Sequence, residues 1–188
     1  EIAKKCGATA AILSIHGIFG QTILRFGTEE QKQKYLPLVS NGGKKTAFAL
    51  TEPNAGSDAA AVKTVAVSDG DDYVITGTKC FITGGNLADY VIVFASTDPS
   101  KGVKGLSAIV VPKGTPGFSI GKVEHKMGIR ASQTAELIFD GCRVPKENLV
   151  GKEGQGFKIA MVGLDGARIG VASQALGIAE GALEESVS

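Results

Sequence analysis

The chain has 188 residues, which is enough for one or two domains with a hydrophobic core. Hydrophobic residues make up 43% of the chain and charged residues 21%, so its composition is that of an ordinary soluble protein. A formal net charge of +1 argues against a broad electrostatic surface for binding nucleic acid.

The first part of the chain, residues 1–45, is predicted to be helical. Its apolar residues recur at helical spacing, at Ala8, Ala11, Ile12, Ile15, Ile18 and Phe19. Gly27 is expected to end this helix, and Thr28 with Gln31 predicts a capping box for the next one. The chain opens at Glu1 without a methionine and already in a helical pattern, so any native leader is expected to lie outside it.

The second part, residues 46–151, is predicted to be a β domain. Runs rich in β-branched and aromatic residues alternate with turn residues, and they lie at 62–68, 73–83, 90–97, 107–111 and 135–139. A buried apolar strand is also expected to end at the polar loop around Thr51. No helices alternate with these strands, so an antiparallel barrel-like or two-sheet unit fits better than a parallel sheet.

The third part, residues 152–188, is predicted to form one long helix from Gly156. Its expected buried stripe consists of Phe157, Met161, Leu164, Val171, Ala175, Ile178 and Ala182. The sequence stops within this helix, so the chain looks like a piece of a longer one. The predicted fold class is therefore α+β, with the end of an N-terminal helical domain, a middle β domain and the first helix of a C-terminal helical domain.

Several common site types find no support in the sequence. The cysteines Cys6, Cys80 and Cys142 are widely spaced and odd in number, which fits reduced thiols in an intracellular compartment and gives no metal-site spacing. His16 and His125 are isolated, so ordinary surface or core roles outweigh catalytic ones. No Ser or Cys has a base partner in the sequence, which leaves a hydrolase triad unsupported. No apolar run is expected to be long enough to span a bilayer.

Two glycine-rich stretches also fail as nucleotide motifs. Residues 117–122 are too short for a P-loop, and Val123 stands where Ser or Thr would bind magnesium. Residues 151–156 follow no convincing strand and lack the spacing of the dinucleotide fingerprint.

The polar stretch 48–58 is a stronger candidate for a binding site. Pro53 blocks helix at the residue before it, and Gly56 allows the backbone to approach a ligand closely. Residues 54–58 can turn several N–H groups and the Ser57 hydroxyl toward one point, an arrangement that suits phosphate oxygens. Taken alone, this stretch is more often an ordinary turn between strands.

A second stretch, 79–85, strengthens that candidate. It is a strand that ends on Thr83, whose hydroxyl is a short donor and acceptor able to meet the edge of a heterocycle. This stretch is also an ordinary turn when it is considered by itself. The two stretches together are much harder to dismiss, and they indicate a ligand site.

Four stretches, 48–58, 79–85, 140–148 and 154–161, resemble the acyl-CoA dehydrogenases in order and spacing. The similarity runs along nearly the whole chain, and residues 164–179 most resemble the short-chain (butyryl-CoA) branch. The resemblance implies FAD-dependent dehydrogenation of a short-chain acyl-CoA to the trans-2-enoyl-CoA. It also implies an electron-transfer flavoprotein as the partner, a homotetramer for the full-length protein, and a location in the bacterial cytoplasm or the mitochondrial matrix. Neither a metal nor nucleic acid is implied.

The resemblance assigns the cofactor site residue by residue. Along the isoalloxazine ring it places Phe48, Leu50 and Thr51, and from the other strand Phe81, Ile82 and Thr83, with Thr83 near N5. Gly56 and Ser57 approach the FAD pyrophosphate, and Ser57 also touches bound CoA. The sequence departs from common family patterns in two places, because Phe81 stands where tryptophan is frequent and Gly84 where asparagine is frequent. These departures put the fine geometry of flavin binding in doubt.

The substrate side is assigned to the last helix. The resemblance places Asp165, Gly166, Ala167 and Arg168 along the acyl-CoA channel. Asp165 and Arg168 lie on one helix face, where they are able to pair or to remain a solvated ion pair. Ala167 stands where related branches carry the catalytic glutamate, so the base is expected beyond Ser188.

Two glutamates within the chain, Glu52 and Glu136, are poor substitutes for that base, because one belongs to a turn and the other to a strand. Other readings of the motifs stay open. They are an acyl-CoA oxidase, an enoyl-CoA reductase of the same fold, and a non-catalytic relative that acts as a binding module.

Overall fold

A computed structural model describes residues 1–187, and Ser188 at the end of the predicted third part lies outside the described residues. The first part is helical, with α1 (Ile2–Lys5), α2 (Gly7–Phe26) and α3 (Glu29–Ser40). α2 ends at Gly27 as predicted. The predicted capping box is also confirmed, because Gln31 N–H donates to Thr28 Oγ1 and Thr28 N–H donates to Gln31 Oε1, each at 3.2 Å.

The middle part forms one eight-stranded sheet in the order β6-β7-β3-β2-β4-β5-β8, with β1 paired to β4. The bounds are β1 (Thr46–Ala49), β2 (Val65–Asp69), β3 (Asp72–Thr83), β4 (Tyr90–Ser96), β5 (Leu106–Pro112), β6 (Phe118–Val123), β7 (Thr134–Pro145) and β8 (Leu149–Val150). The pairing is mostly antiparallel, although β1 and β2 both run parallel to β4. The α+β class is therefore confirmed.

The strands differ from the prediction in three places. β6 and β8 were not expected from the sequence. β7 continues to Pro145, well beyond the predicted run. β2 begins only at Val65, because the carboxylate of Glu52 takes the N–H groups of Lys63 and Thr64 just before it.

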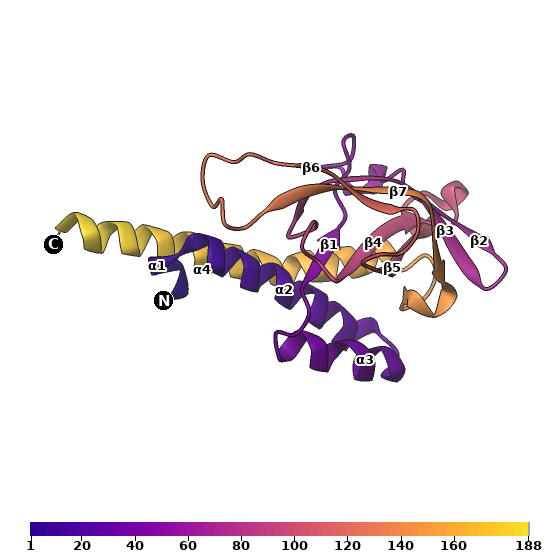
Figure 1. The fold of residues 1–188 in the computed structure, drawn as a ribbon, viewed down its shortest axis with the longest axis horizontal. Helices are drawn as coiled ribbons and strands as arrows, with labels where there is room; N and C mark the ends of the chain where they lie inside the picture. The colour runs from indigo at the N-terminus through magenta and orange to yellow at the C-terminus, as the bar shows by residue number, and fades with distance from the viewer. Residues whose placement is uncertain (188) are drawn as a thin grey trace.

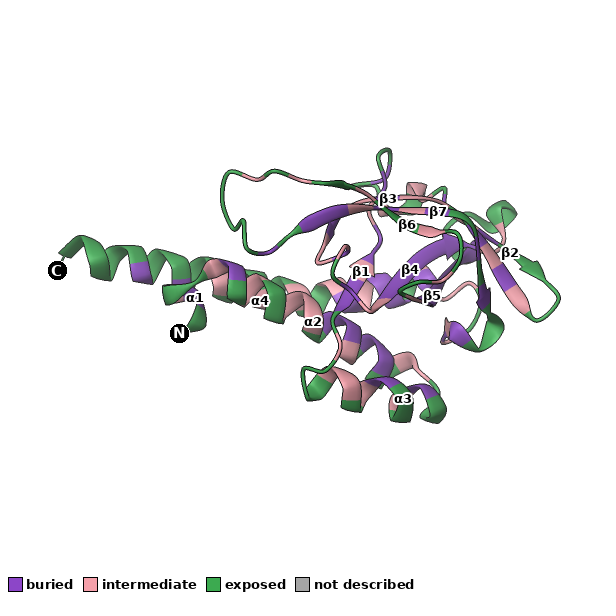
Figure 2. Cartoon of the chain, viewed as in Figure 1, coloured by how far each residue is buried: buried purple, intermediate pink, exposed green. Residues whose placement is uncertain are grey.

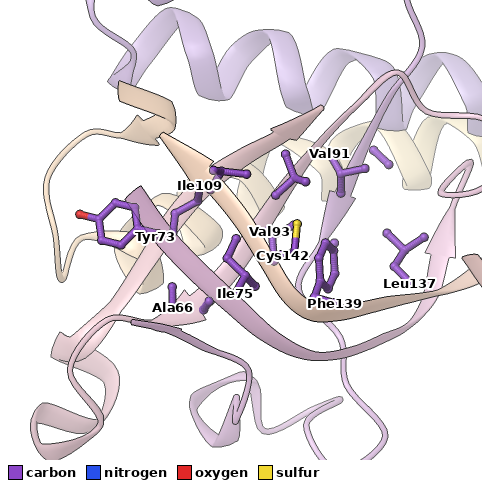
Figure 3. Close-up of a cluster of buried hydrophobic side chains, with 14 of the residues drawn as sticks. Ala66, Tyr73, Ile75, Val91, Val93, Ile109, Leu137, Phe139 and Cys142 are labelled. Atoms are coloured by element: carbon purple, nitrogen blue, oxygen red, sulfur yellow. The ribbon is translucent and has the colours of Figure 1, made fainter. Parts of the chain in front are cut away.

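Hydrophobic side chains fill two cores, one on each side of β4. Within the curve of the sheet, side chains of β2, β3, β4, β5 and β7 point toward one another (Figure 3). On the other face, Ile92 and Phe94 of β4 pack with Phe19, Ile23 and the N-terminal half of the last helix. Because β4 is buried on both faces, its sequence is a continuous run of mainly apolar residues and does not alternate between apolar and polar residues.

The last helix, α4 (Gly156–Val187), runs past the sheet, so its C-terminal end and the N-terminus of the chain lie at the same end of the molecule (Figure 1). Its predicted buried stripe is wrong beyond Leu164, where Val171 and Ile178 are exposed (Figure 2). In that part of α4 the buried residues are Gly177 and Gly181, and the absence of a side chain at both lets α1 approach the backbone of α4 closely.

The expectation about membrane spans also needs correction. By length and composition α2 passes as a helix able to cross a membrane, with a mean hydropathy of 1.3. The core helix of a soluble protein passes the same test. In this fold Phe19 and Ile23 of α2 are fully buried against the sheet and α4, while 28% of the helix's most apolar window is buried.

Candidate active site

A cavity of about 550 Å³ lies where β1, the end of β3, α2 and α4 meet. The loop that follows β1 closes one side of it. Its lining is largely apolar, with a few polar groups: Ile15, Ile18, Phe48, Leu50, Thr51, Gly56, Ser57, Asp58, Ala59, Ala60, Phe81, Ile82, Thr83, Phe157, Met161, Leu164, Ala167, Arg168 and Val171. A mainly apolar cavity with a small number of polar groups is the usual form of a small-molecule site.

The structure brings the two polar stretches of the sequence together at this cavity. The residues expected to bind the cofactor all line it, namely Phe48, Leu50, Thr51, Gly56, Ser57, Phe81, Ile82 and Thr83. Ala167 and Arg168 line it from α4, whereas Asp165 and Gly166 do not. Gly166 instead faces α2, since a Cβ there would lie 3.2 Å from Gln21 Oε1.

Other lining residues were not recognised from the sequence as part of a site. Ile15 and Ile18 of α2, and Phe157, Met161 and Leu164 of α4, had been interpreted only as core positions. Helical periodicity shows which face of a helix is covered, but it does not distinguish a protein core from a ligand cavity. The sequence therefore identified the covered faces of α2 and α4, but not that these faces line a ligand cavity.

A β-bulge shapes the end of β3 that faces the cavity. The pairing of β3 with β7 shifts register twice, between Ile75 and Gly77 and again between Lys79 and Ile82, and Cys80 and Phe81 lie in the second irregularity. The bulge resets the side-chain alternation, so that both Lys79 and Ile82 are buried. Phe81 adopts a φ of 57° and is 64% exposed, which directs its ring away from the core and to the cavity.

The next turn accounts for one departure from the family pattern. Gly84 has a φ of 68°, in the left-handed region. Glycine adopts this region without cost, and asparagine tolerates it better than most residues do. The backbone of this turn therefore suits glycine, and asparagine is compatible with it as well.

Three hydrogen bonds join the polar stretches directly. Cys80 N–H donates to the carbonyl oxygen of Thr51 at 2.9 Å. Lys79 Nζ donates to the carbonyl oxygen of Leu50 at 3.1 Å and to Glu52 Oε1 at 2.8 Å. The end of β1 is thereby fixed against the end of β3.

Glu52 and Lys79 form a buried ion pair behind the cavity wall. Lys79 is fully buried and Glu52 is 7% exposed. Burial lowers the pKa of Lys79 to about 8, although the carboxylate of Glu52 opposes the shift. Burial acts to raise the pKa of Glu52, but the Lys79 ammonium and the hydrogen bonds to the carboxylate outweigh it and hold that pKa below its ordinary value.

Several polar groups at the cavity have no partner in the part of the chain that the structure describes. The hydroxyls of Thr51, Ser57 and Thr83 form no hydrogen bond within residues 1–187. The amides of Gly56 and Ser57 likewise donate to no acceptor among those residues. The guanidinium of Arg168 forms no ion pair there, so the pairing with Asp165 considered from the sequence is absent among these residues. Free donors facing a cavity are available to a ligand.

The loop after β1 supports part of the predicted anion site. A Cβ added to Gly56 would meet no atom within 4 Å, so its backbone borders open space. Ala55 N–H is not available, because it donates to the carbonyl oxygen of Glu52 at 3.1 Å. Within residues 1–187, the amides of Gly56 and Ser57 therefore remain available where Ala55 N–H is not.

Comparison with known proteins identifies relatives of the whole chain. Residues 47–142 match the family model "Acyl-CoA dehydrogenase, middle domain", and residues 1–43 match "Acyl-CoA dehydrogenase, N-terminal domain". A relative named acryloyl-CoA reductase (NADH), from Anaerotignum propionicum, is 65% identical over 100% of this chain and 48% of its own length.

Two solved structures have nearly the same backbone. Butyryl-CoA dehydrogenase from Megasphaera elsdenii matches with a TM-score of 0.97 and 53% identity, over 100% of this chain and 49% of that one. A chain in a structure of the electron transferring flavoprotein of Acidaminococcus fermentans matches with a TM-score of 0.97 and 57% identity, over 98% of this chain and 49% of that one. The chain thus spans about half the length of the relatives it matches.

Proposed function

We propose that this chain, which belongs to the acyl-CoA dehydrogenase family, forms the flavin-binding core of a short-chain acyl-CoA dehydrogenase. Members of this family are oxidoreductases, and FAD is their cofactor. The proposed reaction removes hydrogen from the α- and β-carbons of a short-chain acyl-CoA and gives the trans-2-enoyl-CoA. The observation that carries the proposal is the cavity at which both polar stretches and α4 meet.

The residues around the cavity fit a flavin. Phe48, Leu50 and Ile82 supply apolar walls for a flat ring, and Thr51 and Thr83 offer free hydroxyls at its polar edge. FAD supplies a hydride acceptor when it is bound. The chain's own contribution is to hold the ring and to keep water from the reacting carbons.

The loop after β1 is proposed to hold the charged part of the cofactor. The free amides of Gly56 and Ser57 point to a pyrophosphate, whose oxygens accept hydrogen bonds from such groups. The Ser57 hydroxyl serves the same end, and we propose that it also contacts CoA.

The substrate side of the proposal rests on α4. Arg168 lines the cavity without an ionic partner in the described residues, which suits contact with a polar group of acyl-CoA. Ala167 lines the cavity beside it but cannot accept a proton. Asp165 and Gly166 remain proposed channel residues with weaker support, since neither lines the cavity.

The base that takes the α-proton is proposed to lie outside residues 1–188. Glu52 is unsuitable because its carboxylate is already bound by Lys79 and by two backbone amides. Glu136 does not line the cavity, and its carboxylate accepts from Lys122 N–H at 3.5 Å. A free carboxylate supplied by another segment meets the requirement better.

The direction of the reaction has two candidates. We favour oxidation with electrons passing to an electron-transfer flavoprotein, and the match to a chain in a structure of such a flavoprotein supports this. The second candidate is reduction of a short-chain enoyl-CoA, which is supported by the 65% identity to a protein named acryloyl-CoA reductase (NADH). An acyl-CoA oxidase and a non-catalytic binding module have no such specific support.

One experiment tests the proposal and separates these directions. The full-length protein is purified with FAD and mixed without oxygen with butyryl-CoA, and the flavin absorbance is followed. Bleaching of the flavin, with crotonyl-CoA as the product, supports the dehydrogenase. Steady oxidation of NADH with acryloyl-CoA or crotonyl-CoA supports the reductase instead. A folded protein that binds no flavin contradicts both.

The wider setting completes the proposal. We propose that residues 1–45 end an N-terminal helical domain, 46–151 form the middle domain, and 152–188 begin a C-terminal helical domain. We further propose that the full-length protein is a homotetramer. Its location would be the cytoplasm in a bacterium or the mitochondrial matrix in a eukaryote.

A further inference from the structure

The buried pair of Glu52 and Lys79 has no role in the chemistry described so far. Neither side chain lines the cavity. Moving two charges out of water costs several kcal/mol for each ion, and a buried pair often contributes no net stability. The contacts of this pair indicate a role other than net stability.

The pair connects three segments of backbone. Lys79, on β3, donates to the carbonyl oxygen of Leu50 at 3.1 Å and to the carboxylate of Glu52 at 2.8 Å. That carboxylate in turn accepts from Lys63 N–H at 2.7 Å and from Thr64 N–H at 3.0 Å. The end of β1, the far end of the polar loop and β3 thus meet at one ammonium and one carboxylate.

The segments joined in this way are the two walls of the cavity. Leu50 and Thr51 come directly before Glu52, and the bulge that directs Phe81 to the cavity begins directly after Lys79. β1 pairs with β4, not with β3, so no regular strand pairing holds these walls together. Within residues 1–187, the direct hydrogen bonds from this end of β3 to residues 50–52 are the two from Lys79 and the one from Cys80 N–H.

We infer that Lys79, held by Glu52, is a positioning residue for the flavin, which fixes the Leu50–Thr51 backbone against the end of β3 and so sets the separation of the two walls. This inference rests on the proposed function, since it concerns the same cavity. It assigns Lys79 no contact with the flavin or the substrate. Its effect passes through the backbone of residues that make those contacts.

The experiment separates positioning from simple stabilisation by comparing single and paired variants. Lys79→Met leaves the Glu52 carboxylate buried and unpaired, so it is expected to lower Tm as well as flavin affinity. The double variant Glu52→Gln, Lys79→Met carries no buried charge and keeps similar side-chain volumes. Its Tm is expected to return close to the wild-type value, which makes it the decisive variant.

In the double variant the links from Lys79 to Leu50 and Glu52 are still missing. We therefore expect FAD to bind about tenfold more weakly than to the wild type, as for loss of a hydrogen bond to a charged group. We also expect a shifted flavin spectrum and faster amide hydrogen exchange at Cys80 in the flavin-free protein. The matched control is Tyr73→Phe, which removes a polar contact to Glu153 at the other end of β3. It should leave FAD affinity and the spectrum unchanged.

Two results overturn the inference. A double variant with wild-type Tm, FAD affinity, spectrum and Cys80 exchange shows that the pair is only structural, while the proposed function stands. A folded wild-type protein that binds no flavin overturns the proposed function and the inference with it.

Discussion

At the scale of single residues, the cavity is distinguished by hydroxyl groups that the described protein leaves unused. Thr83 ends β3 at the cavity, and its Oγ1 forms no hydrogen bond within residues 1–187. Removing this hydroxyl therefore breaks no hydrogen bond of the ligand-free fold. The hydroxyl contributes to binding free energy only when a ligand is present.

Replacing Thr83 by valine should therefore affect the flavin and not the fold. Thr83→Val removes a contact worth about 0.5–1.5 kcal/mol net, so the full-length enzyme should show a shifted flavin spectrum and slower reduction by butyryl-CoA. Its Tm without flavin should match that of the wild type. Thr83→Ser keeps the hydroxyl and is the control that should preserve both flavin properties. An unchanged spectrum and reduction rate in the valine variant would exclude this strand end from the flavin site.

Because Lys79 is buried, we expect the free energy of unfolding to depend on pH in an unusual way. The pKa of the Lys79 ammonium is lowered from 10.5 to about 8 in the fold, mainly by burial. Between those values the unfolded chain binds more protons than the folded one, so this group makes the free energy of unfolding rise with pH. The other titratable groups near the ammonium are Glu52 and the thiol of Cys80.

Urea denaturation at several pH values between 8 and 10.5 measures this rise, with the Glu52→Gln, Lys79→Met variant as the reference. The difference in free energy of unfolding between the two proteins should grow by about 2 kcal/mol over the window. Cys142 acts in the opposite direction, since burial raises its pKa to about 11 and its contribution is lost as the pH rises above 9.0. Both proteins contain Cys142, so its effect cancels in the difference. A difference that stays flat with pH would contradict the burial of a charged Lys79.

At the scale of elements, the start of α4 depends on a close approach to the sheet. Gly156 is buried at the first position of α4, and a Cβ there would lie 2.6 Å from the backbone of Ser107 in β5. The contact decides where α4 leaves the sheet, and with it where Phe157 and Met161 meet the cavity. Backbone atoms cannot move aside cheaply, so this position has room only for glycine.

Gly156→Ala should lower the free energy of unfolding by about 1–3 kcal/mol through overpacking, as measured by urea denaturation. The matched control is Gly17→Ala in α2, where a Cβ would meet nothing within 4 Å. That change should be neutral or stabilising by about 0.5–1 kcal/mol, because alanine is the better helix former. Equal effects of the two substitutions would mean that the start of α4 does not pack against β5 as described.

The elements also show how far the sequence could be used. The capping box of Thr28 and Gln31 is a local signal, and it predicted the start of α3 correctly. β6 was missed because Gly121 and a register shift against β7 between Ile120 and Val123 interrupt its alternation. Lys79 was not expected in a core, since lysine is almost never fully buried without a partner, and its partner lies far away in sequence. Long-range pairing of this kind has no local signal.

At the scale of the whole molecule, the described residues 1–187 supply the walls of the cavity, and the one carboxylate that they place on its lining is Asp58, which accepts from Ala60 N–H. Much of α4 is exposed in this structure, including Ile169 and Leu176 at 73% and 69% (Figure 2). The relatives that the chain matches are about twice its length. These observations agree with the proposal that the catalytic base is supplied by another segment.

Residues 1–188 produced alone should therefore bind FAD weakly and fail to oxidise butyryl-CoA. FAD binding by fluorescence titration and turnover with a dye acceptor measure the two properties, and the full-length protein is the positive control. Measurable turnover by the isolated segment would require a base within it. The proposal that the base lies elsewhere would then be wrong.

The bulge at Cys80 and Phe81 has a consequence for how this strand can vary. Because the alternation restarts there, residues 72–79 of β3 and the two residues after the bulge follow two separate phases of one strand. Substitutions at the cavity end can therefore change the site without altering which of residues 72–79 enter the core. Deleting a single residue from the bulge would merge the two phases and turn the side chains on one side of the bulge to the wrong face. A site attached to its scaffold in this way can change through point substitution but not through a change in strand length.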